Sequence, residues 1–215
     1  MLKHPGHRHA LPLALALVLP ALLAATWPAE SDWEPLSYGG TVLGDDCGDV
    51  SGSDYQDIIG DSDAPALQHY DDGENLWFRV RLADAPYSTA GGTPRDWQNF
   101  SVWVLMEMST AGVGTTGSYD FAVRFSGNDE EVSLWENTSA SGNVTSDSPE
   151  DELWSGEAPL AESGSSSAGA AGYLSTGEDF CGGSSDAVDF YLDMYVPWSA
   201  FNDAGVTELD DLQII

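Results

Sequence analysis

The sequence contains very little positive charge. Its 215 residues hold six lysines and arginines against 36 aspartates and glutamates, which gives a formal net charge of −30. Two of the six cations, and none of the acids, lie in the first 29 residues, so the remainder carries 4 − 36 = −32. Nucleic acids and anionic membrane surfaces would repel such a chain, so we exclude both as partners. The acidity is typical of a solvated surface that keeps a protein soluble at high ionic strength, or of a protein that binds cations.

Histidine and lysine are also scarce. Beyond the first 29 residues His69 is the only histidine, and no lysine occurs. One histidine leaves at most one centre for a His-ligated zinc site or a Ser-His-Asp triad, and Schiff-base chemistry needs a lysine. The chain has no G-x-S-x-G sequence. Among so many acids a pair of carboxylates suited to glycoside hydrolysis arises by chance. We therefore expect a protein that is not an enzyme.

Only one long hydrophobic run is present, from Ala10 to Ala25. Basic residues precede it, small residues end it, and Pro12 and Pro20 interrupt it. A membrane span needs about 20 apolar residues, so the run predicts a signal peptide over residues 1–29, cleaved between about Ala24 and Ala29. An uncleaved anchor is the alternative. We expect a secreted or cell-surface protein, without a membrane span after cleavage, in which residues 30–215 form a single domain.

Cysteine occurs only twice, as Cys47 and Cys181, each followed by glycine. In an exported chain an even number of cysteines favours a disulfide, and two free thiols are the alternative. A bridge that closes so long a loop would stabilise the fold by on the order of 4–5 kcal/mol in the chain-entropy model.

Strict alternation of apolar and polar residues is the main structural signal. After a turn at 71–75, the apolar residues of Leu76–Leu82 alternate with Trp77, Arg79 and Arg81, which predicts a strand with one face in a core. Similar patterns cover 100–107, 119–125, 132–135 and 188–196, and in 100–107 both faces are apolar, which indicates a central strand. The segments 84–96 and 137–186 resemble loops. These features predict an all-β fold, an antiparallel β-sandwich of about nine strands, jelly-roll or immunoglobulin-like, with long acidic Gly/Ser-rich loops. The apolar end at 212–215 resembles the start of a strand, so we expect the chain to continue past Ile215.

Two sets of residues are candidate binding sites. Trp77 shares its strand face with Arg79 and Arg81, so these side chains could stack on and hydrogen-bond to a sugar. Alternatively, the tryptophan packs in the protein and the arginines pair with nearby acids. The second set is a group of loop acids that could supply the oxygen ligands of a structural calcium ion, although no EF-hand loop occurs and solvated acids are the alternative. This set comprises Asp45, Asp46, Asp49, Asp54, Asp57 and Asp61.

Several core segments resemble known proteins. Asp57–Asp61 through Leu76–Leu82, together with Val132–Thr138, resembles exported bacterial β-sandwich proteins of unassigned function. The segment Asp189–Phe201, with its Val-Pro-Trp, is similar to a late strand of family 9 carbohydrate-binding modules. The resemblance implies a non-catalytic module with a structural or binding role at or outside the cell surface. The alternative is a carbohydrate-binding module attached to or acting with a polysaccharide-active system. The expected partner is a polysaccharide or another surface protein.

Overall fold

The protein is described from a computed structural model that places residues 26–38, 40–50, 53–108, 119–138, 147–182, 188–201, 205–206 and 212–214. The first 25 residues of the expected signal peptide lie outside these ranges. Within them, no helix has both the length and the apolar character needed to cross a membrane.

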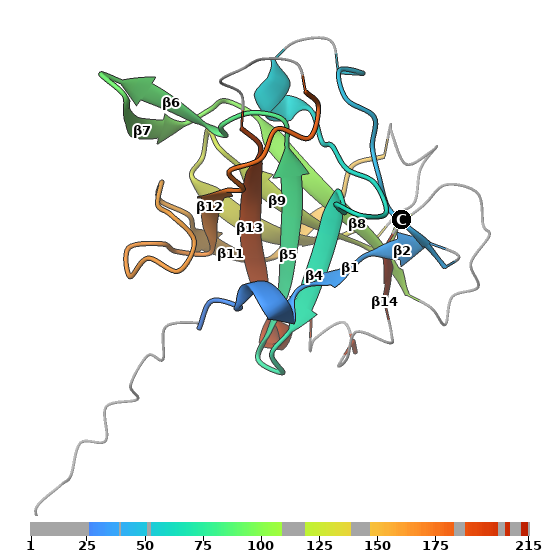
Figure 1. Cartoon of the computed structure of the whole chain (residues 1–215). Coiled ribbons are helices and arrows are strands. Elements are labelled where there is room, and N and C mark those ends of the chain that lie inside the picture. Colours follow the sequence, from blue (N-terminus) through green and yellow to red (C-terminus); the bar gives the residue numbers. More distant parts are fainter. Residues whose placement is uncertain are drawn as a thin grey trace, which may run out of the picture.

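Two five-stranded sheets face each other across a common core (Figure 1). All strand pairs in both sheets are antiparallel, which confirms the predicted β-sandwich. The first sheet has the order β1 (Glu34–Pro35), β4 (Leu67–Asp71), β5 (Asn75–Leu82), β13 (Phe190–Pro197) and β12 (Ala171–Ser175). The second has the order β11 (Asp151–Glu157), β10 (Glu131–Glu136), β9 (Phe121–Ser126), β8 (Ser101–Met108) and β14 (Leu212–Ile214).

Smaller elements connect and flank the two sheets. One hairpin joins β2 (Ser37–Tyr38) to β3 (Thr41–Val42), and another joins β6 (Tyr87–Ala90) to β7 (Thr93–Trp97). The 84–96 segment was predicted as a loop, but it forms most of this second hairpin. Its strands are short and mostly polar, and Gly91 and Gly92 supply the positive φ angles of the turn, so alternation gave no signal there. The described residues also include the 3-10 turns η1 (Glu30–Asp32), η2 (Asp54–Gln56) and η4 (Trp198–Ala200).

The core lies between the facing sides of the sheets. The four apolar residues of β5 expected to point inward, Leu76 to Leu82 at every second position, are all fully buried. They pair across to the apolar residues of β13, with Phe78 opposite Met194 and Val80 opposite Leu192. Alternate residues of β8, β9 and β10 meet them from the other sheet. Complete burial of each such side chain contributes about 1.5–3 kcal/mol to folding.

Two strands lie within the segment 137–186 that the sequence predicted as loop. β11 pairs with β10, and β12 pairs with β13. Each strand contains a glycine against which a large aromatic ring packs. A Cβ at Gly156 would lie 2.5 Å from the Trp154 ring, and a Cβ at Gly172 would lie 2.9 Å from that of Trp27. Tertiary pairing thus imposes strand structure on a stretch with little intrinsic pattern.

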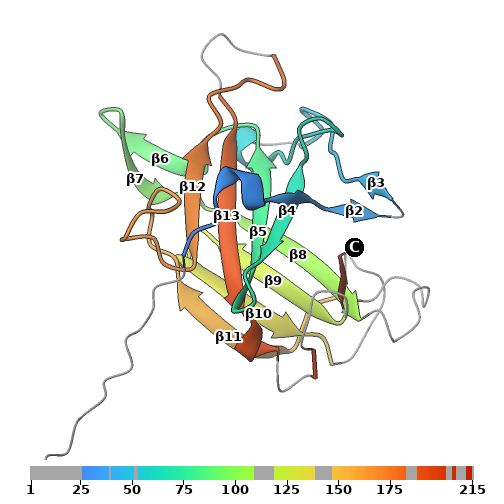
Figure 2. The ribbon, with the colours of Figure 1, turned by 60° about the horizontal axis from the view of Figure 1, so that its bottom comes forward.

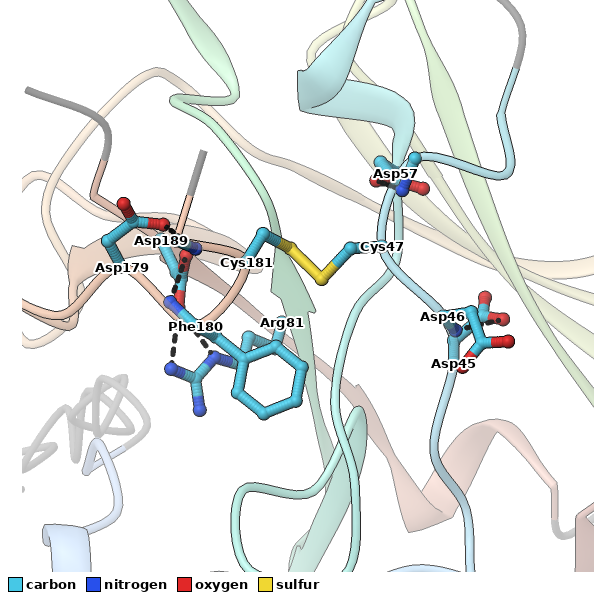
Figure 3. Close-up of a disulfide and its surroundings, with 11 residues drawn as sticks. Asp45, Asp46, Cys47, Asp57, Arg81, Asp179, Phe180, Cys181 and Asp189 are labelled. Carbon is cyan, nitrogen blue, oxygen red and sulfur yellow. Dashed lines mark hydrogen bonds and ion pairs between the residues drawn. A yellow bond between two sulfur atoms is a disulfide. The ribbon is translucent and has the colours of Figure 1, made fainter. Parts of the chain in front are cut away.

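The outer face of the first sheet is covered rather than solvated. The N-terminal segment crosses this face, and η1 lies over β13 and β5 (Figure 2). Beside it, a disulfide joins the loop after β3 to the loop after β12 (Figure 3). The polar face of β5 is therefore enclosed between the sheet and these two segments.

Candidate functional site

Arg79 lies at the centre of this enclosed layer. Its Nε and Nη2 atoms donate to the two carboxylate oxygens of Asp193 at 2.6 and 3.0 Å, and its Nη1 donates to Glu30 at 2.6 Å. The guanidinium also lies 4.3 Å from the ring centres of both Trp33 and Tyr191. Asp193 and Arg79 keep only 1% and 3% of their side-chain surface exposed. The guanidinium is thus fully engaged within the protein.

Arg81 is held in the same way at the other end of the layer. Its Nε donates to Asp189 at 3.0 Å, and Glu178 lies 3.5 Å from Nη2. The ring of Phe180 covers the guanidinium at 5.1 Å, and the Phe180 backbone N–H donates to Asp189 (Figure 3). Asp189 therefore links the arginine to the segment that carries the disulfide.

Trp77 is completely buried. Its indole N–H donates to Asp72 at 2.9 Å, and its ring packs against Tyr195 and Trp27 with ring centres 4.6 and 5.1 Å away. The expected ligand-binding side chains thus all lie under cover, and contact between a ligand and Arg79 or Trp77 would require the N-terminal segment to leave. The structure shows the alternative arrangement, in which the arginines pair with acids and the tryptophan packs.

Burial and pairing shift the pKa values in this layer. Burial alone would lower the pKa of Arg79, but the hydrogen bonds and charge of Asp193, with those of Glu30, raise it, so the arginine stays charged. Burial raises the pKa of Asp193, and the Arg79 hydrogen bonds oppose that shift. Burial also favours a raised pKa for Asp72, yet the hydrogen bonds from Trp77, Asn75 and Glu74 outweigh it and lower the pKa.

The predicted disulfide is confirmed. Cys47 and Cys181 are bonded with their Cα atoms 5.7 Å apart. The bridge fastens the segment around Phe180 to the loop after β3, so it closes the cover over Arg81.

The six acids considered as calcium ligands lie along the loops between β3 and β4. Burial, followed by the charges of Asp49, Asp57 and Asp46, raises the pKa of Asp45. Asp57 is 4% exposed, and one of its oxygens accepts from Gly48 N–H at 2.7 Å while the other has no hydrogen-bond partner. Among the residues that the structure places, no three acids or histidines come together as a metal-binding group. A calcium site here stays a prediction.

The other two acids of that set have local roles. Asp61 Oδ1 accepts from the backbone N–H groups of Asp63 and Ala64, and so stabilises a tight turn. Asp54 begins η2. Their positions are explained by loop structure alone.

The second sheet carries an open cavity on its outer face. Trp103 of β8 lies opposite Arg124 of β9, and Trp135 of β10 lies two residue pairs further along, opposite Ala122 of β9. The cavity has a volume of about 560 Å³ and is lined by Trp103, Leu105, Tyr119, Arg124, Trp135, Asp147, Ser148 and Pro149. We call it the Trp103 cavity. Its volume lies within the range of small-molecule sites.

The side chains of the Trp103 cavity suit a polar ligand with an apolar face. Trp103 is 43% exposed, which is unusual for the largest apolar side chain. Arg124 lies 5.5 Å from the Trp103 ring and pairs with the partly exposed Asp129 at 3.0 Å, while its Nε has no hydrogen-bond partner. Trp135 is half-buried, and its N–H donates to Ser133 at 2.8 Å. The cavity thus presents aromatic surface beside a guanidinium that is partly exposed, although its Nε atom is buried.

The pattern of the sequence around Trp103 does not indicate that this side chain is exposed. Apolar residues occupy both faces of 100–107, which favoured a strand buried on both sides. The strand is instead covered on one side only. Trp103 comes to lie beside Arg124 because of the register between β8 and β9, and a single sequence does not reveal register.

Comparisons with known proteins found no relative. No protein-family model matches the chain, and neither the curated proteins nor the solved structures include a significant match. The resemblance to family 9 carbohydrate-binding modules therefore stays a prediction, and any function must be inferred from the side chains themselves.

Proposed function

We propose that this chain is an exported, non-catalytic β-sandwich module that binds a neutral polysaccharide through the Trp103 cavity, at or outside the cell surface. The observation that carries the proposal is the exposed ring of Trp103 beside the guanidinium of Arg124. The C–H face of a sugar ring packs well on an aromatic ring, and the hydroxyl groups at its edge accept hydrogen bonds from a guanidinium.

Several other tryptophans of the domain have hydrogen bonds or packing contacts that give them a structural role. Trp97 donates to the Ala158 carbonyl in the core, and Trp198 donates to Asp71. Trp33 and Trp77 belong to the covered layer of the first sheet. Trp103 has no comparable structural role, since much of its ring faces solvent. An exposed tryptophan on a rigid sheet supports a binding role.

The charge of the protein favours a neutral ligand. A chain with a net charge near −32 outside its leader repels uronate and sulfate groups. Asp129, which pairs with Arg124 but does not line the cavity, already compensates part of the charge of Arg124. A neutral glycan avoids this repulsion and still offers hydroxyl groups to Arg124. The bound polysaccharide is thus expected to lack acidic groups.

A pull-down of the secreted protein on insoluble neutral polysaccharides tests the proposal. We expect Trp103→Ala to abolish retention while leaving the melting temperature within about 2 °C of that of the unchanged protein, since surface substitutions cost little stability. Tyr38→Ala is the matched control, because Tyr38 is an exposed aromatic residue of β2 outside the cavity. Equal retention of the two variants would overturn the proposal. If Trp103→Ala instead abolished capture of another surface protein, the Trp103 cavity would be a protein interface.

A further inference from the structure

A second cavity lies on the opposite outer face of the sandwich, beside β13. Its volume is about 550 Å³, and it is lined by Thr26, Trp27, Pro28, Gly164, Ser165, Ser166, Ala168, Gly169 and Tyr195. We call it the Tyr195 cavity. From this geometry we infer that the Tyr195 cavity is a second binding site for a neutral sugar. It is separate from the Trp103 cavity, because the two lie on different sheets.

Among the described residues that line the Tyr195 cavity, none has a charged side chain. This is notable in a domain with 36 acids, because acids that faced the cavity would favour a cation. Burial raises the pKa of Tyr195, so its phenol stays neutral. The remaining polar groups are serine and threonine hydroxyls and backbone amides. A neutral ligand that is rich in hydroxyl groups matches this set.

Aromatic side chains form the base of the cavity and are held in place by packing. Tyr195 and Trp27 both pack against the buried ring of Trp77, and Trp154 adds a further ring 6.2 Å from Tyr195. Aromatic rings fixed in this way offer a flat apolar surface at little entropic cost. A ring-shaped ligand with an apolar face, such as a pyranose, can pack on it.

The loop that closes the cavity is shaped by glycine. A Cβ at Gly169 would lie 1.9 Å from the Glu157 carbonyl oxygen, and Gly164 adopts a φ of +81°. Both positions therefore require glycine. Hydrogen bonds from Ser165 N–H to the Glu162 carbonyl and from Ala168 N–H to the Ser165 carbonyl hold the loop between them. The cavity is thus formed before any ligand binds.

Two sites on opposite faces would allow one molecule to bridge two polysaccharide chains. Bridging rests on the proposed function of the Trp103 cavity, but the inference of a site in the Tyr195 cavity does not. Bridging raises the apparent affinity for an insoluble polymer far above that for a short oligosaccharide.

Calorimetric titration of the secreted protein with cellohexaose, xylohexaose and maltohexaose tests the inference. We expect two sites per chain for at least one of these neutral hexasaccharides. Ser166→Phe should weaken binding at one site at least tenfold, because a bulky ring at this exposed position fills the cavity. Ser167→Phe is the matched control, since Ser167 is exposed in the same loop but does not line the cavity. Tyr195→Ala should have the effect of Ser166→Phe, and Tyr195→Phe should bind nearly as the unchanged protein does.

The two proposals fail in different ways. A single site per chain that is lost in Trp103→Ala and unaffected by Ser166→Phe would overturn the second site and leave the proposed function standing. A single site that is lost in Ser166→Phe and unaffected by Trp103→Ala would do the reverse. If none of the three hexasaccharides binds at millimolar concentration, the assignment of neutral sugars to both cavities is wrong.

Discussion

Arg79 and Asp193 form a two-point ion pair on adjacent strands, and both side chains are buried. They lie directly opposite each other in the register of β5 and β13. A buried pair of this kind is strongly destabilising when only one partner is removed, because the other charge stays behind without compensation.

We therefore predict that Asp193→Asn lowers the free energy of unfolding by about 3–5 kcal/mol. Chemical denaturation followed by circular dichroism measures this loss. The control is Asp129→Asn, which breaks the pair between the partly exposed Arg124 and Asp129. It should cost much less stability than Asp193→Asn, because solvent screens an exposed pair. Equal effects of the two substitutions would show that the buried pair has no special role.

Asp72 makes the stability depend on pH. Its pKa is lowered by hydrogen bonds from Trp77, Asn75 and Glu74, against the opposing effect of burial. A carboxylate whose pKa is lower in the folded state stabilises the fold above its unfolded pKa of about 3.9, and this stability is lost as the pH falls through the folded value.

We expect Asp72→Asn to be less stable than the unchanged protein at pH 7, and the difference to shrink as the pH falls below about 4. Melting temperatures from pH 7 to pH 2 measure this convergence. Asp63→Asn, at an exposed position in another loop, is the control for the loss of one carboxylate. A constant gap between Asp72→Asn and the unchanged protein at every pH would contradict the role assigned to the charge.

The sequence predicted the core of this fold more successfully than its sites. Long alternating strands such as Leu76–Leu82 could be identified because one buried face leaves a period of two in the sequence. The strand Ala171–Ser175 could not, because it is defined by contacts with Asp189–Pro197 and with Trp27, far away in the chain. The Trp103 cavity depends on the register of three strands and was missed for the same reason.

The roles of the arginines could be weighed but not decided from the sequence. A strand face with two cations suited both a ligand and the pairing of charges. The decisive element is the N-terminal segment, which brings Glu30 and Trp33 onto Arg79. No local pattern indicates that a segment near residue 30 covers a strand near residue 79.

The disulfide should control the cover over Arg81. We predict that the double variant Cys47→Ala, Cys181→Ala loses about 2–5 kcal/mol of stability. Phe180 and Asp189 lie beside the bridge. Loss of the bridge should therefore accelerate exchange of the amide hydrogens of 178–182 more than exchange of the amide hydrogens of β9. Hydrogen exchange measured by mass spectrometry tests this order, and uniform acceleration along the chain would contradict it.

The acids near Asp45 repel one another, and salt should stabilise the protein by screening this repulsion. The charges of Asp49, Asp57 and Asp46 contribute to the raised pKa of Asp45, after the effect of burial. A raised folded-state pKa favours the fold at low pH, and this contribution is lost as the pH rises through it. We therefore expect Asp45→Asn to melt at a higher temperature than the unchanged protein at pH 7, and sodium chloride to reduce the difference.

The same melting experiment can test whether these acids bind calcium. Melting is measured in calcium chloride and in sodium chloride with chelator at matched ionic strength. A higher midpoint in calcium that disappears in Asp57→Asn would support a site at these acids. Identical midpoints in the two salts would leave screening as the whole effect and remove the calcium hypothesis.

The packing of Trp27 bears on where the predicted signal peptide would be cut. Its ring packs on Trp77, and it occupies the space that the missing side chain of Gly172 leaves free. Removal of Trp27 would uncover Trp77 and remove one wall of the Tyr195 cavity. Within the predicted range of Ala24 to Ala29, we therefore expect cleavage before Trp27, so that N-terminal sequencing of the secreted protein finds this residue retained. Trp27→Ala should cost about 1–3 kcal/mol of stability, since a half-buried aromatic side chain is lost. A secreted chain that begins after Trp27 and is as stable as one that retains it would overturn this assignment.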